Sequence, residues 1–163
     1  MQRPDNQAVN AHLFEAQGAL TLASDMVRGA KYAEAVQAAQ RSIEHNIKAL
    51  YPLVGLDAPH THDAVTGSRG QERDAFGGVL KRLDLSNDLY VKNGIMRLPW
   101  LGKMWASAHE FSSYGYGGVA PSVMFDIEDA QIAVDYAKKV KDGVSALIES
   151  VIQGRIRILS GQA

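Results

Sequence analysis

Lys103 and His109, which lie in one predicted helical segment, are the first residues whose types could support chemistry. Cleavage of RNA without a metal needs a base that takes the proton of the 2′-hydroxyl and a cation that stabilises the charged phosphate. Histidine titrates near neutral pH and lysine carries positive charge, although lysine lacks the planar fork with which arginine binds phosphate. The alternative is structural, with His109 at the edge of the face that carries Trp105 and Lys103 simply exposed. The two residues are therefore a candidate catalytic pair.

A second group of polar side chains comes from one helical stretch and consists of Arg41, Glu44, His45 and Lys48. At about 100° per residue, Arg41, His45 and Lys48 point away from the apolar stripe, and Glu44 lies nearer its edge. Such runs usually form a solvated face with ion pairs between residues three or four positions apart. We therefore expect a solvated face, and we keep Arg41 and Lys48 as candidate contacts to a ligand or partner.

The segment after Gly55 contains residue types that bind zinc or nickel, namely His60, His62 and Asp63. A closed site needs a third or fourth ligand, and the other histidines of the chain are only His12, His45 and His109. The Pro-x-Thr-x-Asp pattern explains the same residues as turn formation and helix capping. We therefore predict no metal site and no cofactor.

Two tyrosines, Tyr114 and Tyr116, stand in the glycine-rich segment YGYGGVAPSVMF. Each could stack on a nucleobase, because every base offers a π-face. The segment contains no Lys or Arg, so positive charge for a nucleic acid would have to come from elsewhere. Packing of the two rings against the rest of the protein is the alternative. The glycines do not form a phosphate loop, because GxxxxGK[ST] and a preceding strand are missing.

Helices must position these residues. Apolar residues recur at every third or fourth position in five segments, at about residues 5–29, 31–54, 72–91, 99–113 and 126–154. Asp5 or Asn6 is expected to cap the first helix, and Asp126 with Asp129 resembles a capping box at the start of the last.

Residues 57–71 and 114–125 are expected to be loops, with one helical turn after Asp63. No segment has the alternating period of a strand, and residues 155–163 have no clear assignment. The apolar arc of the last helix is wider than one neighbouring helix requires, so we expect part of it to contact a second subunit. The sequence therefore predicts an all-α, up-and-down bundle of four to five helices.

The composition limits the classes of protein that fit. The 163 residues suit one domain over residues 1–163, with a core at about 5–152 and a tail from 153. Seventeen Lys and Arg against eighteen Asp and Glu argue against strong non-specific binding of nucleic acid. The absence of cysteine excludes disulfides, a thiol nucleophile and Cys-ligated metal. No apolar run approaches the roughly 20 residues that span a bilayer, so we expect a cytoplasmic protein without membrane contact.

Three stretches together are similar to one known family. They are YAEA at residues 32–35 followed by Glu44 and KAL at 48–50, Gly55 followed by PHTHD at 59–63, and the tyrosine-rich loop followed by FDIEDA at 125–130. Over about residues 5–152 the chain resembles the HEPN domains (higher eukaryotes and prokaryotes nucleotide-binding). The resemblance implies a helical bundle that homodimerises and binds nucleotides or RNA, often in toxin–antitoxin and related conflict systems beside a nucleotidyltransferase.

Many members of that family are metal-independent ribonucleases with an Arg, four to six further residues, and then a His. This sequence departs from that pattern, and its nearest match is KMWASAH at residues 103–109, where Lys replaces Arg. Ser113 stands where the family has an Arg before the loop tyrosine. The leading hypothesis is therefore a dimeric nucleotide- or RNA-associated binding or regulatory module without robust nuclease activity. The alternatives are a divergent ribonuclease that uses Lys103 and His109, and a structural bundle that binds another protein.

Overall fold

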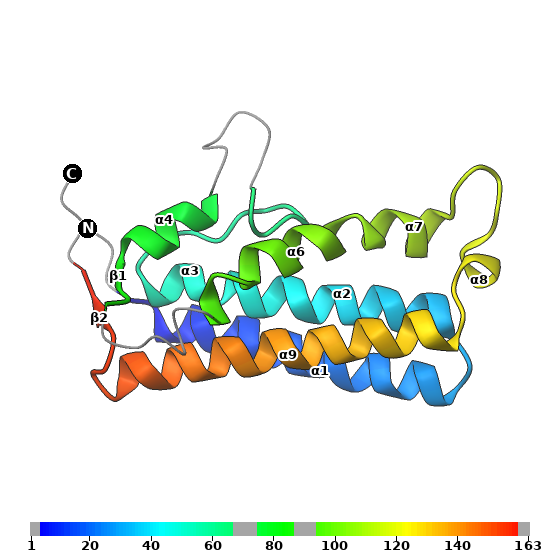
Figure 1. The fold of residues 1–163 in the computed structure, drawn as a ribbon. Helices are drawn as coiled ribbons and strands as arrows, with labels where there is room; N and C mark the ends of the chain where they lie inside the picture. The colour runs from blue at the N-terminus through cyan, green and yellow to red at the C-terminus, as the bar shows by residue number, and fades with distance from the viewer. Residues whose placement is uncertain (1–3, 67–74, 87–93, 160–163) are drawn as a thin grey trace.

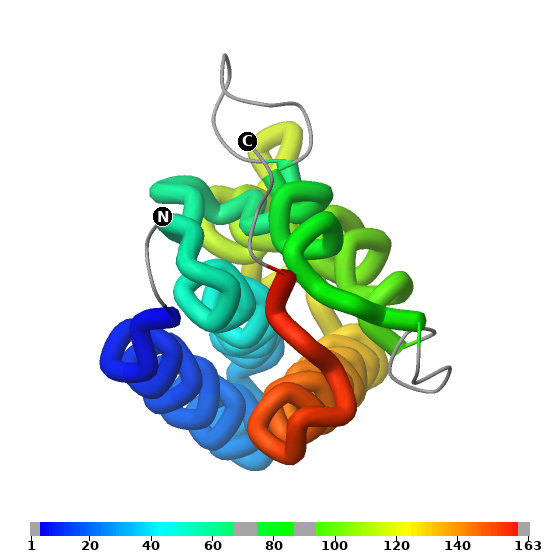
Figure 2. Tube along the Cα trace, turned by 90° about the vertical axis from the view of Figure 1, so that its left-hand side faces the viewer, coloured from blue at the N-terminus to red at the C-terminus, as the bar shows by residue number. Residues whose placement is uncertain are grey.

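The computed structural model confirms the all-α bundle (Figure 1). The long helices α1 (Asn6–Arg28), α2 (Tyr32–Lys48) and α9 (Ile127–Ile152) run side by side, and α6 (Leu98–Ala106) and α7 (Ala108–Tyr114) form the fourth row. Figure 2 shows the four rows side by side, viewed along the bundle, and their buried apolar side chains form one core. Helix α2 contacts α1, α9, α6 and α7, so it is the central element. The structure describes residues 4–66, 75–86 and 94–159.

Helix α1 begins and ends as the sequence predicts. The Asp5 side chain accepts a hydrogen bond of 3.0 Å from the backbone N–H of Ala8, and Gly29 is the C-cap. Without this cap, the N–H of Ala8 in the first turn would have no hydrogen-bond partner within the helix. The buried face of α1 consists of small and medium residues, which bring it close to α2: Val9, Ala16, Ala19, Leu20 and Ala23.

The expected second helix is divided into α2 and a short helix, α3 (Leu50–Leu53). Ala49 between them keeps helical dihedral angles, with φ −60° and ψ −24°. Pro52 explains the end of α2, because proline has no N–H to donate to the carbonyl of Lys48 four residues earlier. Gly55 then turns the chain with a φ of +72°, a conformation that favours glycine.

The prediction for residues 72–91 was wrong in part. Helix α4 spans only Ala75–Lys81, and the strand β1 (Leu83–Asp84) follows it. β1 pairs antiparallel with β2 (Arg157–Ile158), so the tail is tied to the bundle and the expectation of no strand is corrected. Two-residue strands are too short to show an alternating pattern in the sequence. The expected start of this helix at Glu72 and its expected end at Val91 lie outside the described residues.

The expected helix at residues 99–113 is interrupted at Ser107, which separates α6 from α7. Pro99 lies in the first turn of α6, as predicted. Gly102 allows α6 to pack closely, because a Cβ at this position would lie 2.5 Å from Cδ1 of Ile47 and 2.8 Å from Cγ2 of Val65. The loop at 114–125 contains one further short helix, α8 (Pro121–Met124).

Helix α9 starts with the predicted capping box of Asp126 and Asp129. It contacts α1, α2, α3 and α6, and these neighbours within the chain account for the width of its apolar arc. Two residues of that arc remain exposed, Ile127 and Ile152, and they lie at opposite ends of the helix. Among the helices that the structure describes, none is long and apolar enough to cross a membrane.

Candidate functional site

A buried carboxylate on α2, that of Glu44, is the centre of a polar cluster. Its Oε1 accepts a hydrogen bond of 2.6 Å from Nζ of Lys48, and its Oε2 accepts one of 3.3 Å from Nε2 of Gln40. The imidazole of His62 donates from Nδ1 to the same Oε2 at 3.0 Å. Glu44 is 7% exposed and Lys48 is 9% exposed. The cluster is therefore an ion pair inside the protein that reaches the surface through a histidine.

This burial corrects the expected solvated face. Gln40, Glu44 and Lys48 are four residues apart and form one row along α2. The turn that carries His62 and the helix α7 lie against α2 beside this row and remove it from water. Arg41 is the member of the predicted group that does lie on an exposed face, where it pairs with Glu15 of α1 at 2.9 Å.

Two opposing effects set the charge of Glu44. Burial raises the pKa of its carboxyl, and the hydrogen bonds and positive charges of Lys48 and His62 lower it. The balance lies below the ordinary value, so Glu44 is ionised at neutral pH. An ionised carboxylate only accepts hydrogen bonds, so Nδ1 of His62 carries a proton.

The turn that presents His62 is held by several hydrogen bonds. Oδ1 of Asp63 accepts from the backbone N–H groups of Val65 and Thr66 at 3.0 Å and 2.9 Å, which confirms the expected cap after Asp63. The Tyr51 hydroxyl on α3 donates to the carbonyl of Ala64. The loop is thus anchored to α3 just after the imidazole.

His109 of α7 completes the cluster by stacking on His62. The ring centroids are 4.0 Å apart and the planes are inclined by 25°. Burial lowers the pKa of His109, and the neighbouring His62 lowers it further, so its imidazole is neutral at physiological pH. The His62 side chain is 60% exposed. We call Gln40, Glu44, Lys48, His62 and His109 the imidazole–carboxylate cluster.

The structure brings together two of the six predicted site residues, Lys48 and His109. Lys103 lies exposed on α6, and within the described residues it forms no hydrogen bond or ion pair. Tyr114 and Tyr116 are 80% and 70% exposed at the end of α7, where the Tyr116 ring meets Phe111 edge-on. Arg41 faces α1 instead of the cluster. The assignment of these residues to catalysis or ligand binding stays a prediction.

The sequence predicts Glu44 near a solvated helix face and His62 in a turn, and it does not predict that the two side chains pair. The signal was the four-residue spacing of Gln40, Glu44 and Lys48. It shows one row on a helix, but it does not show what covers that row.

A second histidine pair joins α1 to α2. Nδ1 of His12 lies 3.2 Å from Nδ1 of His45, and both side chains are partly buried. Burial lowers the pKa of each imidazole, and the nearby Lys48 lowers both further. Across residues 4–66, 75–86 and 94–159, no group of three or more His, Asp or Glu side chains is arranged to hold a metal ion.

The sequence model of the HEPN domain matches residues 9–147, which include every member of the imidazole–carboxylate cluster. A search of curated protein sequences finds no match. Among solved structures, TT1696 from Thermus thermophilus has a similar fold, with a TM-score of 0.62 and 19% identity over 85% of this chain and 96% of that one.

Proposed function

The chain belongs to the HEPN domain family, whose members are nucleotide-binding or ribonuclease-like modules, and we propose that it is a dimeric nucleotide- or RNA-associated binding or regulatory module. We further propose that the ligand contacts the imidazole–carboxylate cluster. The observation that supports this choice is the His62–His109 stack, which meets solvent on one side and is anchored to a buried carboxylate on the other.

The chemistry of the stack suits a nucleotide. An imidazole ring offers a face on which a base stacks and ring nitrogens that hydrogen-bond to phosphate or base edges. Because Lys48 already neutralises the carboxylate of Glu44, this ion pair presents little net negative charge to an approaching phosphate. Positive charge for the phosphate backbone would come from exposed side chains, of which Lys103 on α6 is the predicted example. A nucleotidyltransferase is the protein partner that the family resemblance suggests.

Fluorescence anisotropy with a short labelled single-stranded RNA, and competition by free nucleoside triphosphates, tests this function. We expect His62→Ala and His109→Ala each to weaken RNA binding by about 5- to 150-fold, the range that corresponds to losing one stacking contact of about 1–3 kcal/mol. His60→Ala is the matched control, because His60 is an exposed histidine of the same turn. Equal affinities for all four proteins would remove the cluster as the binding site, and a wild-type protein that binds neither ligand would refute the function.

A second candidate function, metal-independent cleavage of RNA, is favoured by one specific observation: His109 is a neutral imidazole in contact with another imidazole that a carboxylate orients. His109 would take the proton of the 2′-hydroxyl, and the 2′-oxygen would attack phosphorus. The bond between phosphorus and the 5′-oxygen would break, and a protonated His62 would donate a proton to that leaving oxygen. Lys103 would stabilise the charged phosphate.

Incubation of the protein with single-stranded RNA in the presence of a chelator checks this activity. The expected products carry a 2′,3′-cyclic phosphate and a 5′-hydroxyl, and His109→Ala should abolish their formation. Unchanged cleavage by that variant would show a contaminating nuclease or a different site. If the protein binds the RNA and the RNA remains intact, the cleavage function is refuted and the binding function is retained.

A further inference from the structure

A glycine in the middle of the exposed face of α1 has no explanation within the chain. Gly18 is an interior residue of this 23-residue helix, where glycine is less favourable than alanine. A Cβ at Gly18 would meet no atom within 4 Å, and the backbone there has no positive φ. Neither close packing nor an unusual conformation inside this molecule therefore requires glycine at this position.

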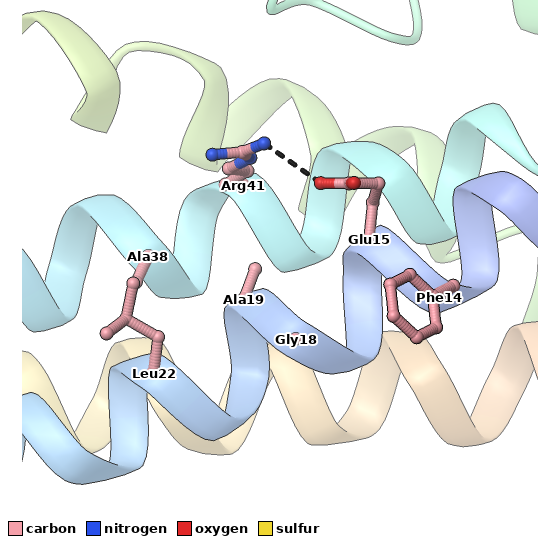
Figure 3. Close-up of a pocket in the computed structure, with 7 residues that line it drawn as sticks. All are labelled: Phe14, Glu15, Gly18, Ala19, Leu22, Ala38 and Arg41. Carbon is pink, nitrogen blue, oxygen red and sulfur yellow. Dashed lines mark hydrogen bonds and ion pairs between the residues drawn. The ribbon is translucent and has the colours of Figure 1, made fainter.

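Two large apolar side chains flank Gly18 at equal distance along the helix. Phe14 is 79% exposed and Leu22 is 50% exposed, and each lies four residues from the glycine. Figure 3 shows Phe14 and Leu22 on either side of the bare backbone at Gly18. They border a shallow hollow of about 180 Å³ between α1 and α2, whose lining residues are Phe14, Glu15, Gly18, Ala19, Leu22, Ala38 and Arg41.

The charges around this hollow are already balanced. Glu15 and Arg41 pair with each other across its rim at 2.9 Å (Figure 3). Gln17 and Thr21, which are also exposed, are uncharged and share a hydrogen bond. The face thus combines apolar projections, an apolar hollow and no unpaired charge, so an identical face can approach it without repulsion between like charges.

We propose that this face of α1, residues 14–22, is the contact between two copies of the chain, with the two α1 helices crossing at Gly18 on a two-fold axis. The proposal rests on the dimeric state in the proposed function and specifies its surface. With the axis at residue 18, Phe14 faces the partner's Leu22, and the two glycine backbones face each other. A two-fold contact needs a self-complementary patch, and the symmetric spacing of Phe14 and Leu22 about Gly18 supplies one.

The geometry also suits helix packing. Residues four apart form the ridge that packs into the groove of a second helix at the commonest crossing angle of helices, about −50°. A glycine at the crossing point lets two backbones approach closely, as small residues do at other close helix contacts. The exposed large apolar residues of α9 are Ile127, Ile132 and Ile152, and they do not form such a ridge. Ile152 lies at the opposite end of the helix from the other two, and Ile127 and Ile132 are five residues apart, so they do not share one row of residues spaced by four.

Sedimentation over a range of protein concentrations tests the surface. We expect the wild type to dimerise, and Gly18→Arg to weaken the dimer at least about tenfold by placing a long charged side chain at the crossing. The substitution should leave helical circular dichroism unchanged, since open space surrounds the Cβ position. Gly94→Arg is the matched control, because a Cβ at Gly94 also meets no atom within 4 Å.

Phe14→Ser provides a second comparison, with Ile152→Ser as its control, because both side chains are 79% exposed. Phe14→Ser should weaken the dimer, whereas Ile152→Ser should not.

Cross-linking gives a positive readout for the same geometry. The chain has no cysteine, so Gly18→Cys introduces a single thiol. On a two-fold axis this thiol lies beside its own copy, within the range of Cα separations that a disulfide bridges, about 4.4–6.8 Å. Mild oxidation should convert Gly18→Cys to a covalent dimer much faster than Gln153→Cys, an exposed control at the end of α9.

The outcomes separate this proposal from the proposed function. A wild type that stays monomeric, or a Gly18→Arg dimer as stable as the wild type, overturns the α1 contact. The RNA affinity of Gly18→Arg, measured by anisotropy with the same labelled RNA, reports separately on the imidazole–carboxylate cluster. A dimer disrupted by Gly18→Arg together with no RNA binding by the wild type would refute the function and keep the contact.

Discussion

Nδ1 of His62 lies 3.0 Å from Oε2 of Glu44, and this contact links a surface turn to the C-terminal part of the central helix. Glu44 in turn binds Lys48, so one carboxylate neutralises a buried ammonium group and orients an exposed imidazole. The same residue is therefore expected to matter for stability and for the proposed ligand contact. Each role can be measured separately.

Removing the Glu44 charge should destabilise the protein strongly. Glu44→Gln leaves the Lys48 ammonium buried without its partner, and breaking a buried ion pair in this way costs about 3–5 kcal/mol. Denaturant unfolding of the wild type and the variant measures the difference. Asp135→Asn is the control, because Asp135 and Lys138 form an exposed pair on α9 whose loss should change the free energy of unfolding little.

Replacing both members of the pair should restore much of the loss. In Glu44→Met/Lys48→Met no buried charge remains, and apolar side chains of similar size often replace buried ion pairs without loss of stability. We expect the double variant to unfold at a higher denaturant concentration than Glu44→Gln. If the double variant were the less stable of the two, an uncompensated Lys48 charge would not be the cause of the loss in Glu44→Gln.

As the pH is lowered, protonation of buried histidines should be the first process to reduce the free energy of unfolding. The pKa values of His12 and His45 lie below their ordinary value of 6.5 in the folded protein, mainly because the rings are buried. Below pH 6.5 the unfolded chain therefore binds protons before the folded one, and the free energy of unfolding falls as the pH decreases. Well above that pH both imidazoles are neutral in the folded and the unfolded chain, so they contribute no slope.

Unfolding curves between pH 8 and about pH 5 measure this slope. His45→Gln should flatten it relative to the wild type, because one of the two buried imidazoles is removed. Below the ordinary Glu value of 4.5, a further loss is expected as the pH falls through the lowered pKa of Glu44. An equal slope in His45→Gln and the wild type would contradict the role of the His12–His45 pair.

Two glycines should respond to alanine in opposite directions. Gly102→Ala forces a methyl group against Ile47 and Val65, so we expect destabilisation of about 1–3 kcal/mol from overpacking. Gly18→Ala meets open space and should stabilise helix α1 by about 0.5–1 kcal/mol, provided that the monomer is measured. Thermal unfolding at low protein concentration compares the two, and a stabilised Gly102→Ala would show that α6 adjusts its position easily.

Lys103→Met tests the predicted phosphate contact. If Lys103 binds one phosphate of single-stranded RNA, its loss should lower the slope of log affinity against log salt concentration by about 0.7. Lys138→Met removes an exposed charge on another helix and is the control for the change in net charge. Equal slopes for both variants would place Lys103 outside the binding surface.

The sequence by itself determined the class of fold and much of its local structure. The helical period, the Asp5 cap, the Asp126–Asp129 capping box and the turn at Asp63 are all set by residues close together in the chain. Local hydrogen bonds and apolar spacing decide such features, and both can be recognised in a sequence. The match to the HEPN domain confirms the family that the short motifs indicated.

Tertiary structure alone decided which polar residues became buried and which met each other. In the sequence, Glu44 and Lys48 have the pattern of a solvated helix face, but in the structure the His62 turn and α7 lie against these two residues. The pairing of β1 with β2 likewise joins segments that are far apart in the chain. The stacking of His62 on His109 likewise depends on how two separate elements dock on α2. Contacts of this kind depend on the packing of distant segments, and no local pattern in the chain encodes that packing.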